Sequence, residues 1–247
     1  MKRILLKIAF DGTAYHGWQI QPNGITVQEV IQNSLEKLLG KPTPVSGSSR
    51  TDAGVHAKEF CLHFDCEDNI PDDAFLRGLN SILPQDISVK ACKTVDSQFH
   101  ARFNALGKTY VYTIYNGKLK DPFLSRYSWH IERKLDENKM NEFCEKIIGE
   151  HDFFAFSSSG RTVSDTVRTV SECGVARDGD IIKLKITGNG FLYNMVRIIA
   201  GTAVDFSDGK IKSEDIDEIF VTKDRSLAGV TAPPMGLCLE KVYYLNY

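Results

Sequence analysis

The chain has 247 residues, of which 42% are hydrophobic and 25% charged, and its formal net charge is −2 at neutral pH. These proportions are typical of a globular protein with one large domain or two modest ones, and they argue against a nonspecific polycation. No run of eighteen apolar residues occurs, so we expect no membrane-spanning helix and no membrane partner. The six cysteines show no Cys-x-x-Cys spacing, which favours free thiols in a reducing cytoplasm.

The first half of the chain alternates strand and helix patterns. A capping box of Thr26 and Glu29 predicts the start of one helix, Gly40 predicts its end, and Pro71 opens a second helix. Period-two alternation of apolar residues predicts the strands. We therefore expect strands at residues 4–10, 60–65 and 87–91, and helices at residues 26–40 and 71–84.

The second half partly repeats this plan. An Asp178-Gly179 turn between apolar runs predicts a hairpin, and residues 191–204 carry the most apolar helix pattern in the chain. We expect further strands at residues 109–115 and 237–244, and further helices from about residue 136 to 149 and around residues 216–220. These elements predict an α+β fold of two related α/β modules, residues 1–105 and 106–247, in which one continuous sheet is covered by helices.

Charge is unevenly distributed along the chain. Residues 100–134 contain seven Lys and Arg against two acids, whereas residues 205–224 contain seven acids against three lysines. A basic segment beside an acidic one suits a protein that presents a phosphate-binding face, although such segments also arise by chance. No cluster of His with Cys or carboxylates suggests a metal site, and we expect none.

The polar loop at residues 47–57 is the strongest candidate for chemistry. It places a permanent cation (Arg50), a hydroxyl (Thr51), an acid (Asp52) and an imidazole (His56) within seven residues. A solvated turn with an Asx-type hydrogen bond would be the ordinary interpretation of such a loop. However, the string from Arg50 to His56 resembles the Arg-Thr-Asp-Ala-Gly-Val-His signature of the tRNA pseudouridine synthase A family, with Ser49 where Gly usually precedes the Arg.

This resemblance implies that Asp52 is a catalytic nucleophile. Converting uridine to pseudouridine breaks the N1–C1′ bond, turns the base and joins C5 to C1′, so neither a redox cofactor nor a nucleotide triphosphate is required. An aspartate carboxylate is ordinarily ionised at neutral pH and is able to attack carbon or accept a proton. Arg50 would favour the ionised form of Asp52 if the two residues pair.

Two further segments resemble family motifs. The string from Lys108 to Tyr112 resembles the second motif, which implies that Tyr110 contacts the target base; core packing is the alternative for a single tyrosine on a strand. The Phe99–Phe103 segment resembles a stretch between those motifs, which implies that Arg102 contacts a phosphate or the active site. Without the resemblance, that segment would be an ordinary turn between modules.

The last two candidates lie near the C-terminal end of the chain. Arg197 lies within an apolar helix pattern, so it either extends to solvent or meets a carboxylate or phosphate. The family's Phe-Leu-x-x-x-Val-Arg motif implies that Arg197 pairs with the catalytic acid. In the Ala232–Leu239 segment, the resemblance implies that a leucine packs on the target base, and Leu237 is favoured over Leu239.

Together these motifs resemble the family in order from Ile8 to Val242. The resemblance implies an antiparallel sheet with helices on one face, an active cleft between the halves, and a cytoplasmic, cofactor-free isomerase. Its partners would be tRNA, modified at positions 38–40 of the anticodon stem-loop, and a second copy of the chain in a homodimer, with no DNA. The alternatives are a catalytically inactive protein that binds structured RNA and a small-molecule hydrolase that uses Asp52. Whether Asp52 attacks C1′, attacks C6 or abstracts a 2′ proton stays open.

Overall fold

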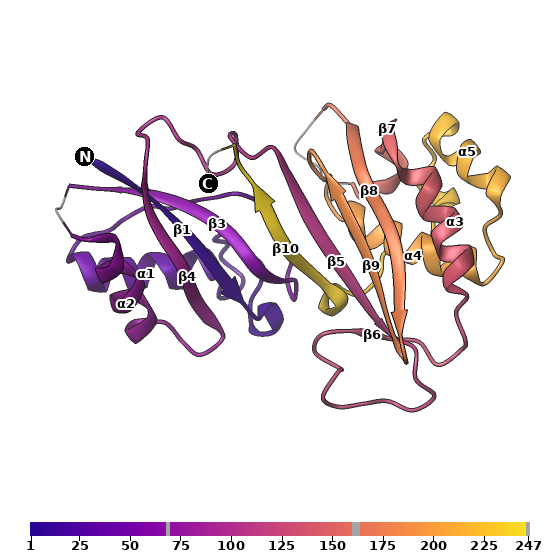
Figure 1. Cartoon of the computed structure of the whole chain (residues 1–247), viewed down its shortest axis with the longest axis horizontal. Coiled ribbons are helices and arrows are strands. Elements are labelled where there is room, and N and C mark those ends of the chain that lie inside the picture. Colours follow the sequence, from indigo (N-terminus) through magenta and orange to yellow (C-terminus); the bar gives the residue numbers. More distant parts are fainter. Residues whose placement is uncertain (68–69, 160–163, 246–247) are drawn as a thin grey trace. The chain divides into compact units, whose positions relative to one another are not determined.

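The structure, a computed structural model, describes residues 1–67, 70–159 and 164–245. The chain forms two compact units, one of Met1–Leu106 with Leu239–Tyr247 and the other of Gly107–Cys238. Five α-helices and ten strands are found in the described ranges, which confirms the predicted α+β class (Figure 1). No helix in these ranges is both long and apolar enough to span a membrane.

The first unit is built around four strands in the order β4-β1-β3-β10. Their bounds are β1 Lys2–Phe10, β3 His56–Cys66, β4 Ile87–Val95 and β10 Leu237–Tyr243, and the short β2 Ser46–Gly47 pairs with β3. Strand β1 runs antiparallel to both neighbours, so Leu6 lies opposite Leu62 on one side and Cys92 on the other. Leu6 and Leu62 are fully buried and contribute to the core of this unit.

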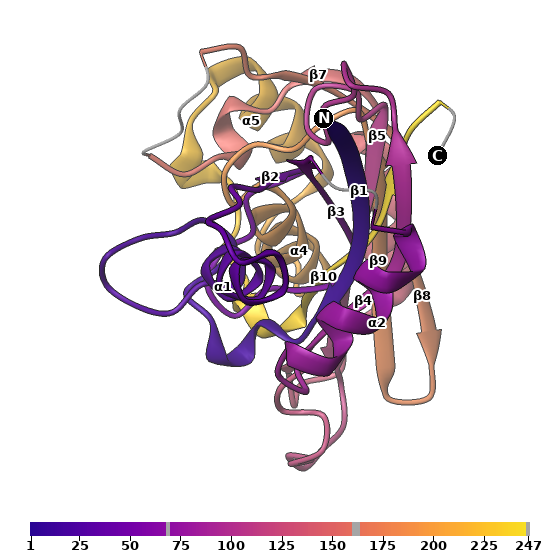
Figure 2. The same cartoon turned by 90° about the vertical axis from the view of Figure 1, so that its left-hand side faces the viewer.

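Helices α1 (Val27–Leu39) and α2 (Asp72–Ile82) contact each other, and α2 packs along β4 (Figure 2). The predicted start of α1 is confirmed, because the Thr26 hydroxyl accepts a hydrogen bond from the Glu29 amide at 3.3 Å. Gly40 ends the helix in a left-handed conformation, with φ at 70°. The buried face of α1 carries Ile31 and Leu35.

The second unit has strands in the order β5-β9-β8-β7. Their bounds are β5 Gly107–Tyr115, β7 Gly149–Asp152, β8 Val167–Asp178 and β9 Ile181–Gly188, and these pairs are antiparallel, whereas β6 Trp129–His130 pairs in parallel with β5. The predicted hairpin is present, because β8 and β9 meet at the Asp178-Gly179 turn. Helix α3 (Glu137–Ile147) packs on β8, α4 (Met195–Ser207) packs on α3 and β5, and α5 (Ser213–Thr222) lies beside α3.

The most apolar helix begins later than its sequence pattern predicts. The pattern started the helix at Phe191, but α4 starts at Met195, after Asn194 with φ at 62°. A residue in the left-handed region interrupts a right-handed helix. The Asn194 side chain is held by Ser158, to which its Nδ2 donates at 2.9 Å, and by Arg197, from which its Oδ1 accepts at 2.8 Å. These hydrogen bonds set the start of the helix.

Candidate functional site

The loop that carries Asp52 is joined to β3 by hydrogen bonds at its first end and closed by a turn at the other. Ser48 donates its amide to the Cys61 carbonyl at 2.7 Å, and its hydroxyl accepts the Cys61 amide at 3.3 Å. At the other end the Val55 amide donates to the Asp52 carbonyl at 3.2 Å, and Gly54 supplies the positive φ of 78° that this turn requires. Asp52 therefore lies in a tight turn directly before a core strand.

A second segment of the chain packs its backbone against the same loop. The Trp18 amide donates to the Thr51 carbonyl at 3.1 Å. Gly17 has φ at 82°, and a Cβ atom placed there would lie 2.4 Å from the Thr51 carbonyl oxygen and 3.1 Å from the Asp52 carbonyl carbon. The Trp18 ring stacks on Phe60 of β3, with centroids 4.2 Å apart. A residue with a side chain at position 17 would displace the Asp52 backbone, so this close approach requires glycine.

His56 has a structural role at the end of the loop. Its ring is buried, and Nδ1 accepts a hydrogen bond from the Gly12 amide at 3.0 Å. Asp11 Oδ1 lies 3.1 Å from the same nitrogen. A ring nitrogen that accepts a hydrogen bond from the Gly12 amide carries no proton, so it does not donate to the Asp11 carboxylate. We therefore interpret the contact with Asp11 as proximity, and the contact with Gly12 as the one that orients the ring.

The polar side chains next to Asp52 differ in exposure. Asp52 is half-buried, whereas the Arg50 side chain is exposed and forms no ion pair in the part of the chain that the structure describes. Thr51 is 8% exposed, and its hydroxyl has no hydrogen-bond partner among the described residues. The effect of Arg50 on Asp52 therefore stays a prediction.

The two tyrosines of β5 have different surroundings within the second unit. Tyr110 lies opposite Ile186 of β9, is 6% exposed, and meets the ring of Phe191 edge-on at 5.2 Å. Tyr112 is fully buried, and its hydroxyl donates to the Pro233 carbonyl at 2.7 Å. Burial raises the pKa of the Tyr112 hydroxyl. Core packing and a hydrogen bond therefore account for Tyr112, whereas Tyr110 is also buried and has the ring of Phe191 against it.

Arg197 lies in the first turn of α4 and donates hydrogen bonds to groups of the second unit. Its Nε donates to the Ala232 carbonyl at 2.8 Å, and its Nη1 donates to the Asn194 side chain. The Ala232 amide in turn donates to the Arg197 carbonyl at 3.1 Å. These contacts explain how an apolar helix accommodates a guanidinium group. Asn194 and Ala232 were not among the predicted site residues, because no local pattern in the sequence indicates a contact between positions 197 and 232.

Leu237 follows a turn that packs on Tyr112. It is 6% exposed and begins β10, whereas Leu239 is fully buried. A Cβ atom at Gly236 would lie 2.6 Å from the Tyr112 ring, so the turn before Leu237 is in close contact with β5. Leu237 is therefore slightly more exposed than Leu239, although both are buried.

Arg102 belongs to the first unit and is exposed. Its guanidinium lies 5.8 Å from the centroid of the Phe103 ring. The segment is held in shape by His100, whose amide donates to the Asn104 side chain at 2.6 Å and whose Nδ1 accepts the Arg102 amide at 3.1 Å. An exposed guanidinium on an ordered turn is suited to contact a phosphate. No group of three or more His, Cys, Asp or Glu in the described ranges is arranged to hold a metal ion.

Comparison with known proteins identifies the class of protein. The family model described as tRNA pseudouridine synthase matches residues 7–104 and 143–245, which is most of the chain. This chain therefore belongs to the tRNA pseudouridine synthase family, an isomerase family that acts on tRNA. The predicted family is confirmed.

Its similarity to individual curated proteins is high over the full length. The chain is 47% identical over 245 residues to a protein of Clostridium kluyveri, covering 99% of this chain and 100% of that protein. It is 47% identical over 244 residues to a protein of Caldicellulosiruptor saccharolyticus. It is 44% identical over 244 residues to a protein of Thermoanaerobacter sp. strain X514. Each of these alignments covers 99% of this chain and 100% of the relative. All three relatives are named tRNA pseudouridine synthase A.

Proposed function

We propose that this chain converts uridine to pseudouridine at positions 38–40 of the tRNA anticodon stem-loop, with Asp52 as the nucleophile. The observation that carries the proposal is the placement of Asp52. It is the one carboxylate of the Arg50–His56 string, and it lies in a turn fixed by Gly17, Trp18 and β3. A carboxylate held in one geometry lowers the entropic part of the barrier to attack on carbon.

The reaction needs a small number of groups besides the acid. The N1–C1′ bond breaks, the C5–C1′ bond forms, one proton leaves C5, and one proton is taken up at N1. In this proposal Tyr110 contacts the target base and assists removal of the C5 proton. Leu237 packs on the base, and Arg197 acts on the catalytic acid. Arg50 assists Asp52, and Arg102, which is exposed, contacts a phosphate of the RNA.

The assembly is also part of the proposal. We propose that the protein is a cytoplasmic homodimer whose two subunits together bind one tRNA, as the family resemblance implies. Sedimentation of the protein alone and with tRNA measures this directly. A monomer under both conditions would contradict the dimer without affecting the assignment of Asp52.

Release of tritium from C5-labelled uridine in unmodified tRNA is the test of the reaction, because pseudouridine has the same mass as uridine. A tRNA with uridine at positions 38–40 should release label, whereas the same tRNA with cytidine at those three positions should release none. Release from both substrates would contradict the assigned positions. Absence of release from either substrate, with folded protein that binds tRNA, would favour the inactive RNA-binding alternative.

A further inference from the structure

The loop between β5 and β6, residues 116–128, exposes an unusual set of side chains. Leu119 is 79% exposed and Phe123 is 87% exposed, among the highest values for large apolar residues in the described chain. Lys118 and Lys120 are also exposed, and the loop has one acid, Asp121. Exposed apolar and cationic side chains that alternate over a few residues indicate a contact surface.

The tip of this loop is ordered by its own hydrogen bonds. The Asp121 carboxylate accepts the Phe123 amide at 2.8 Å, and the Asp121 carbonyl accepts the Leu124 amide at 3.2 Å. The Ser125 hydroxyl donates to the Pro122 carbonyl at 2.9 Å. The turn therefore presents Phe123 in a defined position, which reduces the conformational entropy cost when a partner binds.

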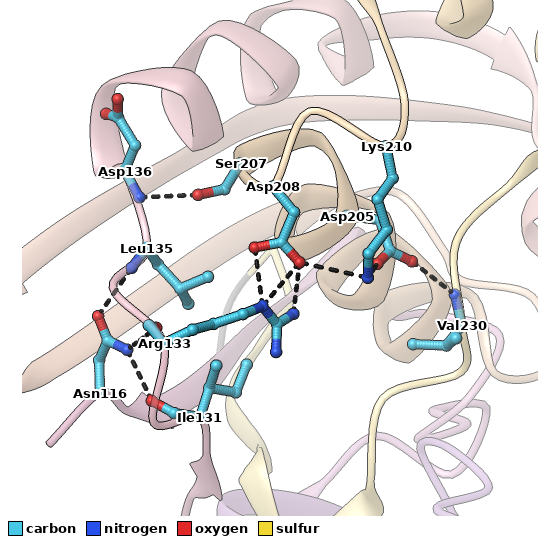
Figure 3. Close-up of polar contacts among 10 residues, drawn as sticks. All are labelled: Asn116, Ile131, Arg133, Leu135, Asp136, Asp205, Ser207, Asp208, Lys210 and Val230. Carbon is cyan, nitrogen blue, oxygen red and sulfur yellow. Dashed lines mark hydrogen bonds and ion pairs between the residues drawn. The ribbon is translucent and has the colours of Figure 1, made fainter. Parts of the chain in front are cut away.

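The base of the loop is fastened as well (Figure 3). Asn116 follows β5, and its Nδ2 donates to the Ile131 carbonyl at 2.7 Å while its Oδ1 accepts the Leu135 amide at 3.1 Å. Two residues before Leu135, Arg133 donates to both carboxylate oxygens of Asp208 at 2.8 Å, just beyond the end of α4. Both arms of the loop are thus joined to each other and to the helix.

We propose that the β5–β6 loop docks RNA, with Phe123 stacking on an unpaired base and Lys118 and Lys120 contacting phosphates. The proposal rests on the proposed function, because it takes tRNA as the substrate. Cations complement phosphates, and base–aromatic stacking depends little on sequence. A second copy of the chain is a poorer occupant, because a two-fold contact through this loop would bring its lysines face to face.

The test is the affinity for tRNA at several salt concentrations. Lys118→Ala with Lys120→Ala should flatten the log–log salt dependence by roughly 0.7–0.9 for each phosphate that these lysines no longer neutralise. Lys90→Ala with Lys183→Ala removes the same charge from exposed positions on β4 and β9, and it should leave the slope unchanged. Equal slopes for both double variants would overturn the lysine contacts, since net charge alone would then explain the effect.

Phe123→Ala separates stacking from charge. It should weaken tRNA binding roughly 5- to 150-fold, the range expected when one base–aromatic stack is removed, with no change in salt slope. Val221→Ala, at an 81% exposed residue of α5, is the matched control and should bind as wild type does. Wild-type affinity of Phe123→Ala would overturn the stacking contact, and a shift from dimer to monomer in sedimentation would show a contact between copies instead.

These binding measurements are independent of catalysis. If the proposed function fails, wild-type protein releases no tritium, whatever its affinity for tRNA. If the docking proposal fails, tritium release remains and the loop variants bind as wild type does. Below saturation, the loop variants should release tritium more slowly than wild type, in proportion to their lost affinity for tRNA.

Discussion

The Asp52 loop and the β5–β6 loop are both polar, but they differ in how they are packed against the rest of the chain. The Asp52 loop is short and is packed by the backbone of Gly17 and Trp18, with one neighbouring hydroxyl buried. The β5–β6 loop is long, is fastened at its base by Asn116, and displays Phe123 to solvent. A sequence comparison of polarity alone would treat the two loops as similar. This difference in packing supports the two proposals, that Asp52 acts in the chemistry and that the β5–β6 loop binds RNA.

The largest effect short of removing the acid is expected from Gly17→Ala. The new methyl group would enter the space of the Thr51 carbonyl, and φ of 82° is itself strained for alanine. A displacement of the order of 1 Å at a catalytic group costs about 100-fold in rate, so we expect turnover to fall by about that factor or more. Single-turnover tritium release measures it.

Gly40→Ala is the matched control for that variant. Gly40 has φ at 70°, but a Cβ atom placed there has nothing within 4 Å. It should lower stability by about 1 kcal/mol and leave the turnover of the folded protein unchanged. Equal losses of turnover in the two variants would show that global stability, not the position of Asp52, is responsible.

Tyr110→Phe should produce the next largest effect. The ring and its contact with Phe191 remain, so tRNA binding should be close to wild type, while loss of the hydroxyl should reduce product formation by about 100-fold. Tyr112→Phe removes a buried hydrogen bond to Pro233 and should cost about 1 kcal/mol of stability with normal turnover. Equal loss of binding and turnover in Tyr110→Phe would show that the ring, rather than the hydroxyl, carries the role.

Asp208→Asn should affect stability and leave turnover unchanged. Hydrogen bonding to Arg133 holds the pKa of the Asp208 carboxyl below its usual value, with a further contribution from Lys210, which also pairs with Asp205. Because the folded-state pKa is depressed, this stabilisation is complete above the unfolded pKa of about 4 and is lost as pH falls through the folded value. Urea denaturation should show a loss of about 1–3 kcal/mol at pH 7 that shrinks below pH 4.

An unchanged difference between Asp208→Asn and wild type at pH 3 would contradict the ion-pair origin of this stability. Asp208 pairs with Arg133, which lies at the base of the β5–β6 loop. Reduced turnover in folded Asp208→Asn protein would therefore contradict the expectation that this loop takes no part in catalysis.

The smallest effect is expected from Thr51→Val. The Thr51 hydroxyl is buried and has no hydrogen-bond partner among the described residues, so an isosteric methyl group removes an unsatisfied polar atom. Stability should stay equal or rise by up to about 1 kcal/mol in thermal denaturation. A loss of stability of more than about 1 kcal/mol would show that the Thr51 hydroxyl forms a hydrogen bond in solution. A fall in turnover without a loss of stability would show that the hydroxyl contacts substrate.

Sequence patterns predicted the parts of the fold that depend on local interactions. The Thr26 cap, the left-handed Gly40 and the Asp178-Gly179 hairpin each follow from a few adjacent residues. The start of α4 did not, because it is set by the contact of Asn194 with Ser158, 36 residues away. The place of β10 beside β3 likewise joins segments at opposite ends of the chain.

The candidate site was predictable to a similar extent. The motif around Asp52 indicated the residue types, but the requirement for glycine at position 17 arises from its contact with Thr51, which lies far along the chain. Periodicity placed Tyr110 and Tyr112 on one face of β5 but could not distinguish them, and the hydrogen bond to Pro233 identifies Tyr112 as the core residue. The sequence placed His56 in this loop, but its contact with the Gly12 amide, 44 residues away, could not be predicted from the motif.

Asp52→Asn is the measurement that tests the central claim most directly. The substitution keeps the size of the side chain and removes its charge, whereas Asp178→Asn makes the same change in an exposed turn. Tritium release from unmodified tRNA should fall by more than about 1,000-fold in Asp52→Asn, with tRNA affinity retained, and should be unchanged in Asp178→Asn. Release near the wild-type rate from Asp52→Asn would contradict the assignment of Asp52 as the nucleophile.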